Sequence, residues 1–194
     1  TRPIANMTVI SPCDMYEAEK ATLAAAKMKG PVYIRLAREK TPVFTTPDTP
    51  FEIGKASILW VEPEGTKPDV SLIACGALVH NAIAAAQQLE SEGIKVRLIN
   101  AVSVKPMDEE TIVAAAADAG AVVTIEEHQV QGGMGSAIAE VLAKNYPVPI
   151  EFIGVQNHFG ESGEPQQLIE HFGMGVKHII EAAKKVIARK VYSS

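Results

Sequence analysis

The stretch Val122–Leu142 constrains the fold of this chain more than any other part of its sequence. It opens with four β-branched residues, Val122 to Ile125, an apolar run typical of a strand that is buried on both faces. Polar residues follow, then glycines, and then apolar residues at helical spacing, namely Ile138, Val141 and Leu142. The sequence therefore predicts a strand, a turn and a helix, the repeating unit of α/β proteins.

The turn of this unit is rich in glycine, which permits positive φ and close approach of another backbone. At such a junction the carboxyl end of the strand and the free N–H groups of the helix face one crevice, where ligands or partner subunits bind. The turn is therefore a possible subunit interface or anion-binding site, formed by Glu126, Glu127, His128, Gly132, Gly133, Gly135 and Ser136. The alternative, which we favour for the glycines, is that they only let the helix pack closely on the strand.

Composition excludes several classes of partner. The 194 residues carry a formal net charge of −5, and no basic block or aromatic platform occurs, which argues against nucleic-acid and anionic-membrane partners. No apolar run approaches the roughly 20 residues of a membrane helix, and we expect no secretory leader. Cys13 and Cys75 have neither a second pair nor a histidine at ligand spacing, so they predict no disulfide framework or zinc site. We expect a cytoplasmic protein.

The first 44 residues predict a single β-α-β unit. Its elements are a strand at Met7–Ile10, a helix with Ser11, Pro12 and Asp14 at its start and Gly30 at its end, and a strand at Val32–Leu36. Such a unit exposes two sheet edges and cannot close a core by itself. We therefore expect residues 1–44 to be the incomplete tail of a domain that lies mostly upstream of Thr1.

A proline-rich segment separates this unit from the rest of the chain. Within Glu39–Gly54, three prolines stand among threonines, a composition that stiffens an extended segment. We predict a linker over residues 45–54 and a complete second domain over residues 55–194.

The second domain shows alternating strand and helix patterns. Strands at Lys55–Val61 and Val70–Ala74 are joined by a loop short enough for an antiparallel hairpin. The remaining elements are a helix ending at Gly93, a strand at Ile94–Val104, a helix at Met107–Ala119 capped by Asp108, the Val122–Leu142 unit, a strand at Pro149–Val155 and a closing helix from Val176 to Ile187. This order predicts an α/β fold: a three-layer αβα domain with a mostly parallel five-stranded sheet and one antiparallel edge strand.

Six motifs occur in an order that is itself informative. They are NMTVISPCD at Asn6–Asp14, YIRLAREKTP at Tyr33–Pro42, FEIGKA at Phe51–Ala56, KPMD at Lys105–Asp108, EEHQVQGGMGSAIAE at Glu126–Glu140 and FGESG at Phe159–Gly163. Together they resemble the C-terminal part of transketolase and its thiamine-diphosphate relatives. The resemblance implies that residues 1–44 are the tail of a pyrimidine-binding domain. It also implies that the second domain is a whole transketolase C-terminal domain. Deoxyxylulose-phosphate synthase and the β subunits of 2-oxoacid dehydrogenases share this domain, but EEHQ and FGESG favour transketolase.

The resemblance implies a function in transferring two-carbon ketol units between sugar phosphates, as in the pentose phosphate pathway. The complete enzyme would use thiamine diphosphate and magnesium and would form a homodimer. The family's GDG motif with a distant Asn is absent from this sequence, and the glutamate that contacts the aminopyrimidine would lie before Thr1. We therefore expect this chain alone to bind no cofactor and to be inactive. Its partners would be upstream transketolase domains or an N-terminal subunit, and its main contribution would be assembly.

One substrate contact is implied as well. Arg38 falls where the family places an arginine that binds the sugar phosphate, and a planar guanidinium suits that task. The alternative is that Arg38, like Arg35, is a solvated surface charge; we expect Arg35 to be structural.

The other polar residues favour structural roles. Glu126 and Glu127 are consecutive, and consecutive strand residues point to opposite faces, so they share one site only if the strand has already ended. The glycine run lacks the G-x-G-x-x-G spacing of dinucleotide sites. No third ligand at metal spacing accompanies His158, Glu161, His171 and His178. We therefore expect these residues to have surface or interface roles. Two rival functions remain: a regulatory anion-binding module and a purely structural dimerisation domain.

Overall fold

The computed structural model describes residues 1–190, so the last four residues of the predicted second domain lie outside the described residues. The strands are β1 (Thr8–Ile10), β2 (Val32–Ile34), β3 (Ser57–Trp60), β4 (Val70–Ala74), β5 (Val96–Asn100), β6 (Ser103–Lys105), β7 (Val122–Gln129) and β8 (Ile150–Val155). The helices are α1 (Met15–Ala25), a 3-10 turn at Gly76–Leu78, α2 (Val79–Ser91), α3 (Glu109–Ala119), α4 (Met134–Asn145), α5 (Pro165–His171) and α6 (Val176–Ile187).

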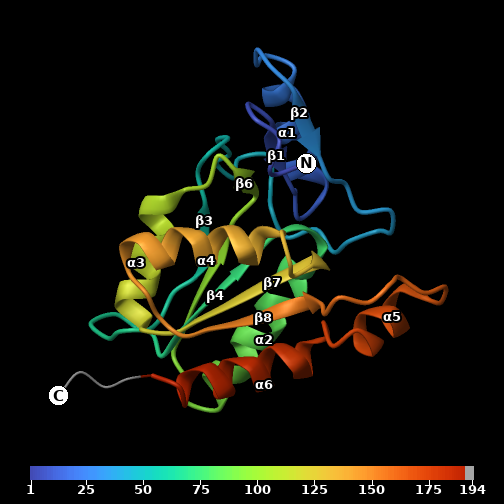
Figure 1. The fold of residues 1–194 in the computed structure, drawn as a ribbon. Coiled ribbons are helices and arrows are strands. Elements are labelled where there is room, and N and C mark those ends of the chain that lie inside the picture. The colour runs from blue at the N-terminus through green and yellow to red at the C-terminus, as the bar shows by residue number, and fades with distance from the viewer. Residues whose placement is uncertain (191–194) are drawn as a thin grey trace.

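A five-stranded sheet with the order β3-β5-β4-β7-β8 forms the centre of the molecule (Figure 1). Its strands are parallel except β3, which pairs antiparallel with β5 at one edge. One apolar cluster packs α2 and α6 on one face, and a second packs α3 and α4 on the other. The predicted α/β class and three-layer arrangement are therefore confirmed. Among residues 1–190, no helix is both long and apolar enough to cross a membrane.

The predicted hairpin between the first two strands of this sheet is wrong. β3 pairs with β5, with Ile58 opposite Ile99, and β4 lies on the far side of β5. Every residue of β4 is buried, and both of its edges are taken by parallel neighbours. β3 is only half buried, which suits the edge of a sheet.

The predicted single strand Ile94–Val104 is also wrong, because it divides into two strands that belong to different sheets. The chain leaves the large sheet after Asn100 and enters a small sheet with the order β2-β1-β6. Ala101 and Val102 are buried at this crossing, so nothing in their composition marks a break. The carbonyl of Val102 accepts a hydrogen bond from the backbone N–H of Ser11, the residue that follows β1. This bond joins the leading unit to the crossing segment.

The leading β-α-β unit packs on the rest of the chain through this small sheet. β1 pairs in parallel with β2 and antiparallel with β6, which belongs to the predicted second domain. In Figure 1 the unit lies at one end of the large sheet. Its helix ends at Ala25, earlier than the predicted Gly30. The division of the chain into residues 1–44, 45–54 and 55–194 remains a prediction, and the pairing of β1 with β6 joins residues from both sides of it.

Candidate functional site

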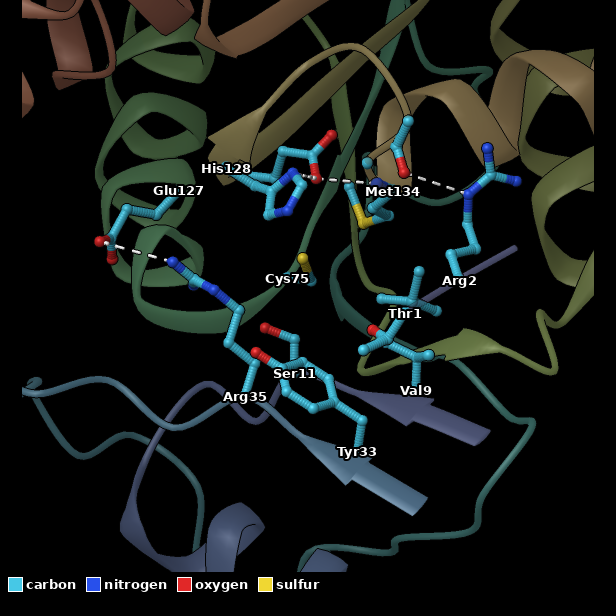
Figure 2. A pocket seen from close by; sticks show the side chains of 14 residues that line it. Thr1, Arg2, Val9, Ser11, Tyr33, Arg35, Cys75, Glu127, His128 and Met134 are labelled. Atoms are coloured by element: carbon cyan, nitrogen blue, oxygen red, sulfur yellow. Dashed lines mark hydrogen bonds and ion pairs between the residues drawn. The ribbon is translucent and has the colours of Figure 1, made fainter. Parts of the chain in front are cut away.

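The carboxyl ends of β4 and β7 meet at the point where the large sheet changes its direction of winding. After β4 the chain continues to β5 on one side, and it later returns to β7 on the other side. Crevices at such points are where open α/β sheets bind ligands. A cavity of about 170 Å³ lies here, and the leading unit closes it from the opposite side (Figure 2). Among the residues that line it are Arg2, Ser11, Tyr33, Arg35, Cys75, Glu126, Glu127, His128, Gly132, Gly133 and Met134.

Glu126 caps the first turn of α4. Its side chain is buried, and its two carboxylate oxygens accept hydrogen bonds from the backbone N–H groups of Met134 at 2.7 Å and Gly135 at 2.8 Å. Burial raises the pKa of this carboxyl, although the two N–H donors act in the opposite direction. The carboxylate thus occupies the helix N-terminus, where a bound anion would otherwise sit.

The glycines of the turn allow this arrangement. A Cβ on Gly133 would overlap the Glu126 carboxylate, and a Cβ on Gly135 would lie 2.5 Å from Oγ1 of Thr124 on β7. Gly132 has a φ of +81°, which disfavours other residues. Ser136 closes the turn, because its hydroxyl donates to the carbonyl of Val130 and accepts from the N–H of Gly132. The turn therefore has the close helix-on-strand packing that we considered as the alternative to ligand binding.

Strand β7 continues past Ile125, where the sequence pattern had placed its end. Glu126 and Glu127 nevertheless both line the cavity, because the pairing of β7 with β8 is irregular between Ile125 and Gln129, but they do not share one set of partners. Glu127 lies next to Arg35, whose Nη2 is 3.8 Å from Oε1 of Glu127, and this pair joins the large sheet to the leading unit (Figure 2). The structural role expected for Arg35 fits this contact. The imidazole of His128 is half exposed, with Nδ1 4.0 Å from Oε2 of Glu126 and 2.8 Å from the carbonyl of Gln129.

Several residues of this cavity were not found by sequence reasoning, among them Arg2, Ser11, Tyr33 and Cys75. Arg2 binds the carboxylate of Glu140 with two hydrogen bonds and the carbonyl of Gly132 with a third. Its partners are 130 and 138 residues away in sequence, so no local pattern announces the contact. Ser11 and Tyr33 each lie in one of the six motifs, and their positions there were the available signal.

Arg38 does not reach this cavity. It lines a larger groove of about 1000 Å³ on the neighbouring surface, between the segment that follows β2, the start of α2 and the loop before α5. Arg35 and Glu127 line both the cavity and the groove. The sequence-predicted site residues thus fall into two adjoining places: the α4 turn with its cavity, and Arg38 in the groove.

Two of the remaining histidines, His171 and His178, lie close to carboxylates. Nε2 of His171 is 3.3 Å from Oε1 of Glu161, and Nδ1 of His178 is 3.7 Å from Oε2 of Glu170. Across the described part of the chain, no group of three or more His, Cys, Asp or Glu side chains could hold a metal ion.

Comparison with known families shows which family this chain belongs to. A family model described as the transketolase C-terminal domain matches residues 61–179. This chain belongs to the transketolase C-terminal domain family.

Similar proteins include a transketolase subunit and a transketolase C-terminal section. The chain is 42% identical over 189 residues to the 6-deoxy-6-sulfo-D-fructose transketolase subunit SqwH of a Clostridium species. This alignment covers 97% of the chain and 57% of the relative. It is 37% identical to a putative transketolase C-terminal section of Methanocaldococcus jannaschii, with 95% and 58% covered. The chain therefore spans somewhat more than half the length of these relatives.

Two solved structures are similar to nearly the whole of this chain. A split-gene transketolase, described as an inactive β4 tetramer, superposes on this chain with a TM-score of 0.92 at 41% identity. The superposition covers 98% of this chain and 61% of the split-gene transketolase chain. The transketolase of Leishmania mexicana shares the fold with a TM-score of 0.73 at 22% identity.

The α4 turn of this transketolase C-terminal chain does not fit a magnesium-bound diphosphate. The N-terminus of α4, the turn that could cradle a phosphate, already holds the carboxylate of Glu126. The GDG motif is absent from the sequence.

Proposed function

We propose that this chain is the C-terminal part or subunit of a thiamine-diphosphate-dependent transketolase that transfers two-carbon ketol units between sugar phosphates. The observation that carries the proposal is the similarity to transketolase subunits over nearly the whole chain. In the complete enzyme the cofactor supplies the carbanion chemistry. This chain contributes to assembly, and Arg38 contributes a contact to the substrate phosphate.

The surroundings of Arg38 support a role in binding an anion. Its side chain is exposed and lines the groove, and within residues 1–190 no hydrogen bond or ion pair engages its guanidinium. Other arginines of the chain form ion pairs with carboxylates: Arg2 with Glu140, Arg97 with Glu62 and Asp118, and Arg189 with Glu151. A guanidinium left without a carboxylate can offer its full set of donors to a phosphate.

Assembly with further subunits is part of the same proposal. A relative of 41% identity is a split-gene transketolase whose structure is a β4 tetramer. We propose that this chain likewise forms a homodimer or larger assembly and acts with upstream domains or an N-terminal subunit. The turn from Glu126 to Ser136 is our candidate for a subunit contact.

The rival functions are less well supported. The relatives named above are transketolases rather than deoxyxylulose-phosphate synthases or 2-oxoacid dehydrogenases. A regulatory anion at the start of α4 would have to displace Glu126 from two backbone N–H groups. Titration of the isolated chain with inorganic phosphate tests that rival, since saturable binding that is lost in a Ser136→Ala variant would favour it.

The phosphate contact is tested by Arg38→Ala in the complete enzyme, formed with the upstream part. Loss of a charge-assisted hydrogen bond should cost about 1.5–3 kcal/mol, or about ten- to a hundredfold in kcat/KM for phosphorylated sugars. Unphosphorylated sugars should be little affected. Arg189→Ala, which removes an exposed arginine just after the end of α6, is the matched control. Equal losses on both kinds of sugar would refute the phosphate role.

A further inference from the structure

The carboxylate of Asp14 holds together two segments that are far apart in sequence. It caps α1 by accepting from the N–H of Glu17 at 3.1 Å. It also accepts from the N–H of Phe44 at 3.0 Å, from the N–H of Thr45 at 2.7 Å and from the hydroxyl of Thr45 at 2.6 Å. Asp14 and Thr45 are both buried, so these bonds are shielded from competition with water.

The Thr45 side of this network lies at one end of the segment that carries Arg38. At the other end, the N–H of Arg35 donates to the carbonyl of Ile10 at 2.8 Å and extends the pairing of β2 with β1. Between these two ends, no backbone hydrogen bond of residues 36–43 is made to any described residue. The position of Arg38 therefore depends on how the two ends are fixed.

Two further contacts reinforce the Asp14 end. Phe44 packs against the apolar cluster on the α2 side of the sheet. Lys20, one and a half turns along α1, donates to the carbonyl of Thr46 at 2.7 Å. Burial alone would raise the pKa of Asp14, but the donors from Thr45, Glu17 and Phe44 outweigh it and hold that pKa below its usual range. The carboxylate therefore stays ionised, and accepts all four bonds, across the neutral range.

We propose that Asp14 is a positioning residue for the anion contact of Arg38: it fixes the far end of the 35–45 segment and so sets where the Arg38 guanidinium lies in the groove. This inference rests on the proposed function of Arg38. It predicts that weakening the Asp14 network selectively impairs recognition of the phosphate.

The chain contains a matched control for the structural part of this role. Asp108 caps α3 by accepting from the N–H of Thr111, and it also accepts from the N–H of Ala56 at 3.0 Å. It thus combines a helix cap with a clamp on a distant segment, as Asp14 does, but its segment carries no arginine. Asp108→Asn should lower stability without changing substrate selectivity.

The experiment measures kcat and KM of the complete enzyme with a phosphorylated and an unphosphorylated acceptor sugar. In Asp14→Asn an amide N–H₂ can face the N–H groups of Phe44 and Thr45, which breaks their bonds. We expect KM for the phosphorylated sugar to rise about three- to tenfold, the effect of one to two lost hydrogen bonds, with kcat and the unphosphorylated sugar nearly unchanged. Adding Asp14→Asn to Arg38→Ala should cause no further loss of selectivity, because the substitution acts through Arg38.

A second pair of variants leaves the α1 cap intact and covers the case in which Asp14→Asn fails to fold. Thr45→Val removes the hydroxyl bond to Asp14 and should change selectivity in the same direction by a smaller factor. Thr45→Ser keeps the hydroxyl and should behave like the unaltered enzyme. If Arg38→Ala is selective for phosphorylated sugars but Asp14→Asn and Thr45→Val are not, the positioning role is wrong and the phosphate role stands. If Arg38→Ala itself shows no selectivity, both are wrong.

Discussion

The carboxylate of Glu126 occupies the space that a side chain on Gly133 would need. A Cβ at Gly133 would overlap this carboxylate, lying 2.6 Å from Oε1, and would lie 2.7 Å from the carbonyl of Gln129. Glu126 cannot turn away without leaving the N–H groups of Met134 and Gly135 unpaired in a buried place. The glycine and the glutamate of the motif therefore depend on each other.

Gly133→Ala should consequently destabilise the protein although it adds only a methyl group. Either the alanine displaces Glu126 from its two N–H donors or the turn moves away from β7. We expect a loss of about 1–3 kcal/mol in the free energy of unfolding, the usual cost of an unsatisfied buried polar group. Chemical denaturation followed by circular dichroism measures it.

Gly160→Ala is the matched control for this substitution. A Cβ there would meet no atom within 4 Å, and no positive φ is involved. Its free energy of unfolding should stay within about 0.5 kcal/mol of the original. Equal stability of the two variants would contradict the structural role of Glu126.

Buried Glu17 should make stability depend on pH. It accepts hydrogen bonds from Nδ2 of Asn100 and from the N–H of Cys13, both at 2.7 Å. Burial is the main cause that raises its pKa, and the nearby charge of Asp14 acts in the same direction. A carboxyl with a raised pKa in the folded state contributes stability that is complete below the ordinary glutamate pKa of about 4.3 and is lost as the pH rises through the raised value.

The free energy of unfolding should therefore fall across that pH window in the original protein, and Glu17→Gln should remove this part of the slope. Glu19→Gln, on the exposed side of the same helix, should leave the slope unchanged. Denaturation curves at half-unit pH steps give the comparison. A slope that is identical with and without Glu17 would rule out its contribution.

The two thiols should be inert in the folded chain. Burial raises the pKa of Cys75 to about 12 and raises that of Cys13 as well. The thiolate is the reactive form, and at pH 8 a thiol with a pKa of 12 is ionised to only about one part in ten thousand. We expect negligible reaction with a chromogenic disulfide at pH 8 and two thiols per chain after unfolding. One thiol reacting within seconds in the folded protein would show that this region opens readily.

Most of the strand and helix order was predictable because it depends on local patterns, although α5 was not predicted. Two examples are the β-branched run at Val122–Ile125 and the Asp108 cap of α3. Each depends only on residues that are close together in the sequence. Which strands pair was less predictable from the sequence. The pairing of β3 with β5 rather than β4 depends on how the whole sheet is buried. The break between β5 and β6 was hidden because Ala101 and Val102 are as apolar as the strands beside them.

The candidate site was predictable only in part, for the same reason. The glycines and acids of the α4 turn are adjacent in sequence, so their cluster is visible there. The opposite wall of the cavity comes from Ser11, Tyr33 and Arg2, which reach it through the pairing of β1 with β6. A sequence pattern carries no record of a contact between residues more than a hundred positions apart.

Limited proteolysis should cut the chain first between Arg38 and Phe51. Residues 38–40 are exposed, and they precede the Thr45 anchor, so trypsin has access to the bonds after Arg38 and Lys40. The remainder, which begins at Glu39 or Thr41 after these cuts, should resist further cleavage because its sheet is covered on both faces. Mass spectrometry of the time course identifies the cut sites.

The cut protein should nevertheless stay together. The fragment up to the cut remains paired through β1 with β6, and the contacts of Arg2 with Glu140 and of Arg35 with Glu127 join the same two parts. Cleavage removes one covalent connection and none of these contacts, so both fragments should elute at one position in native size exclusion and separate only in denaturant. Separation under native conditions would mean that the small sheet is too weak to hold the leading unit. Early cleavage within Val122–Leu142 would mean that this stretch does not organise the fold.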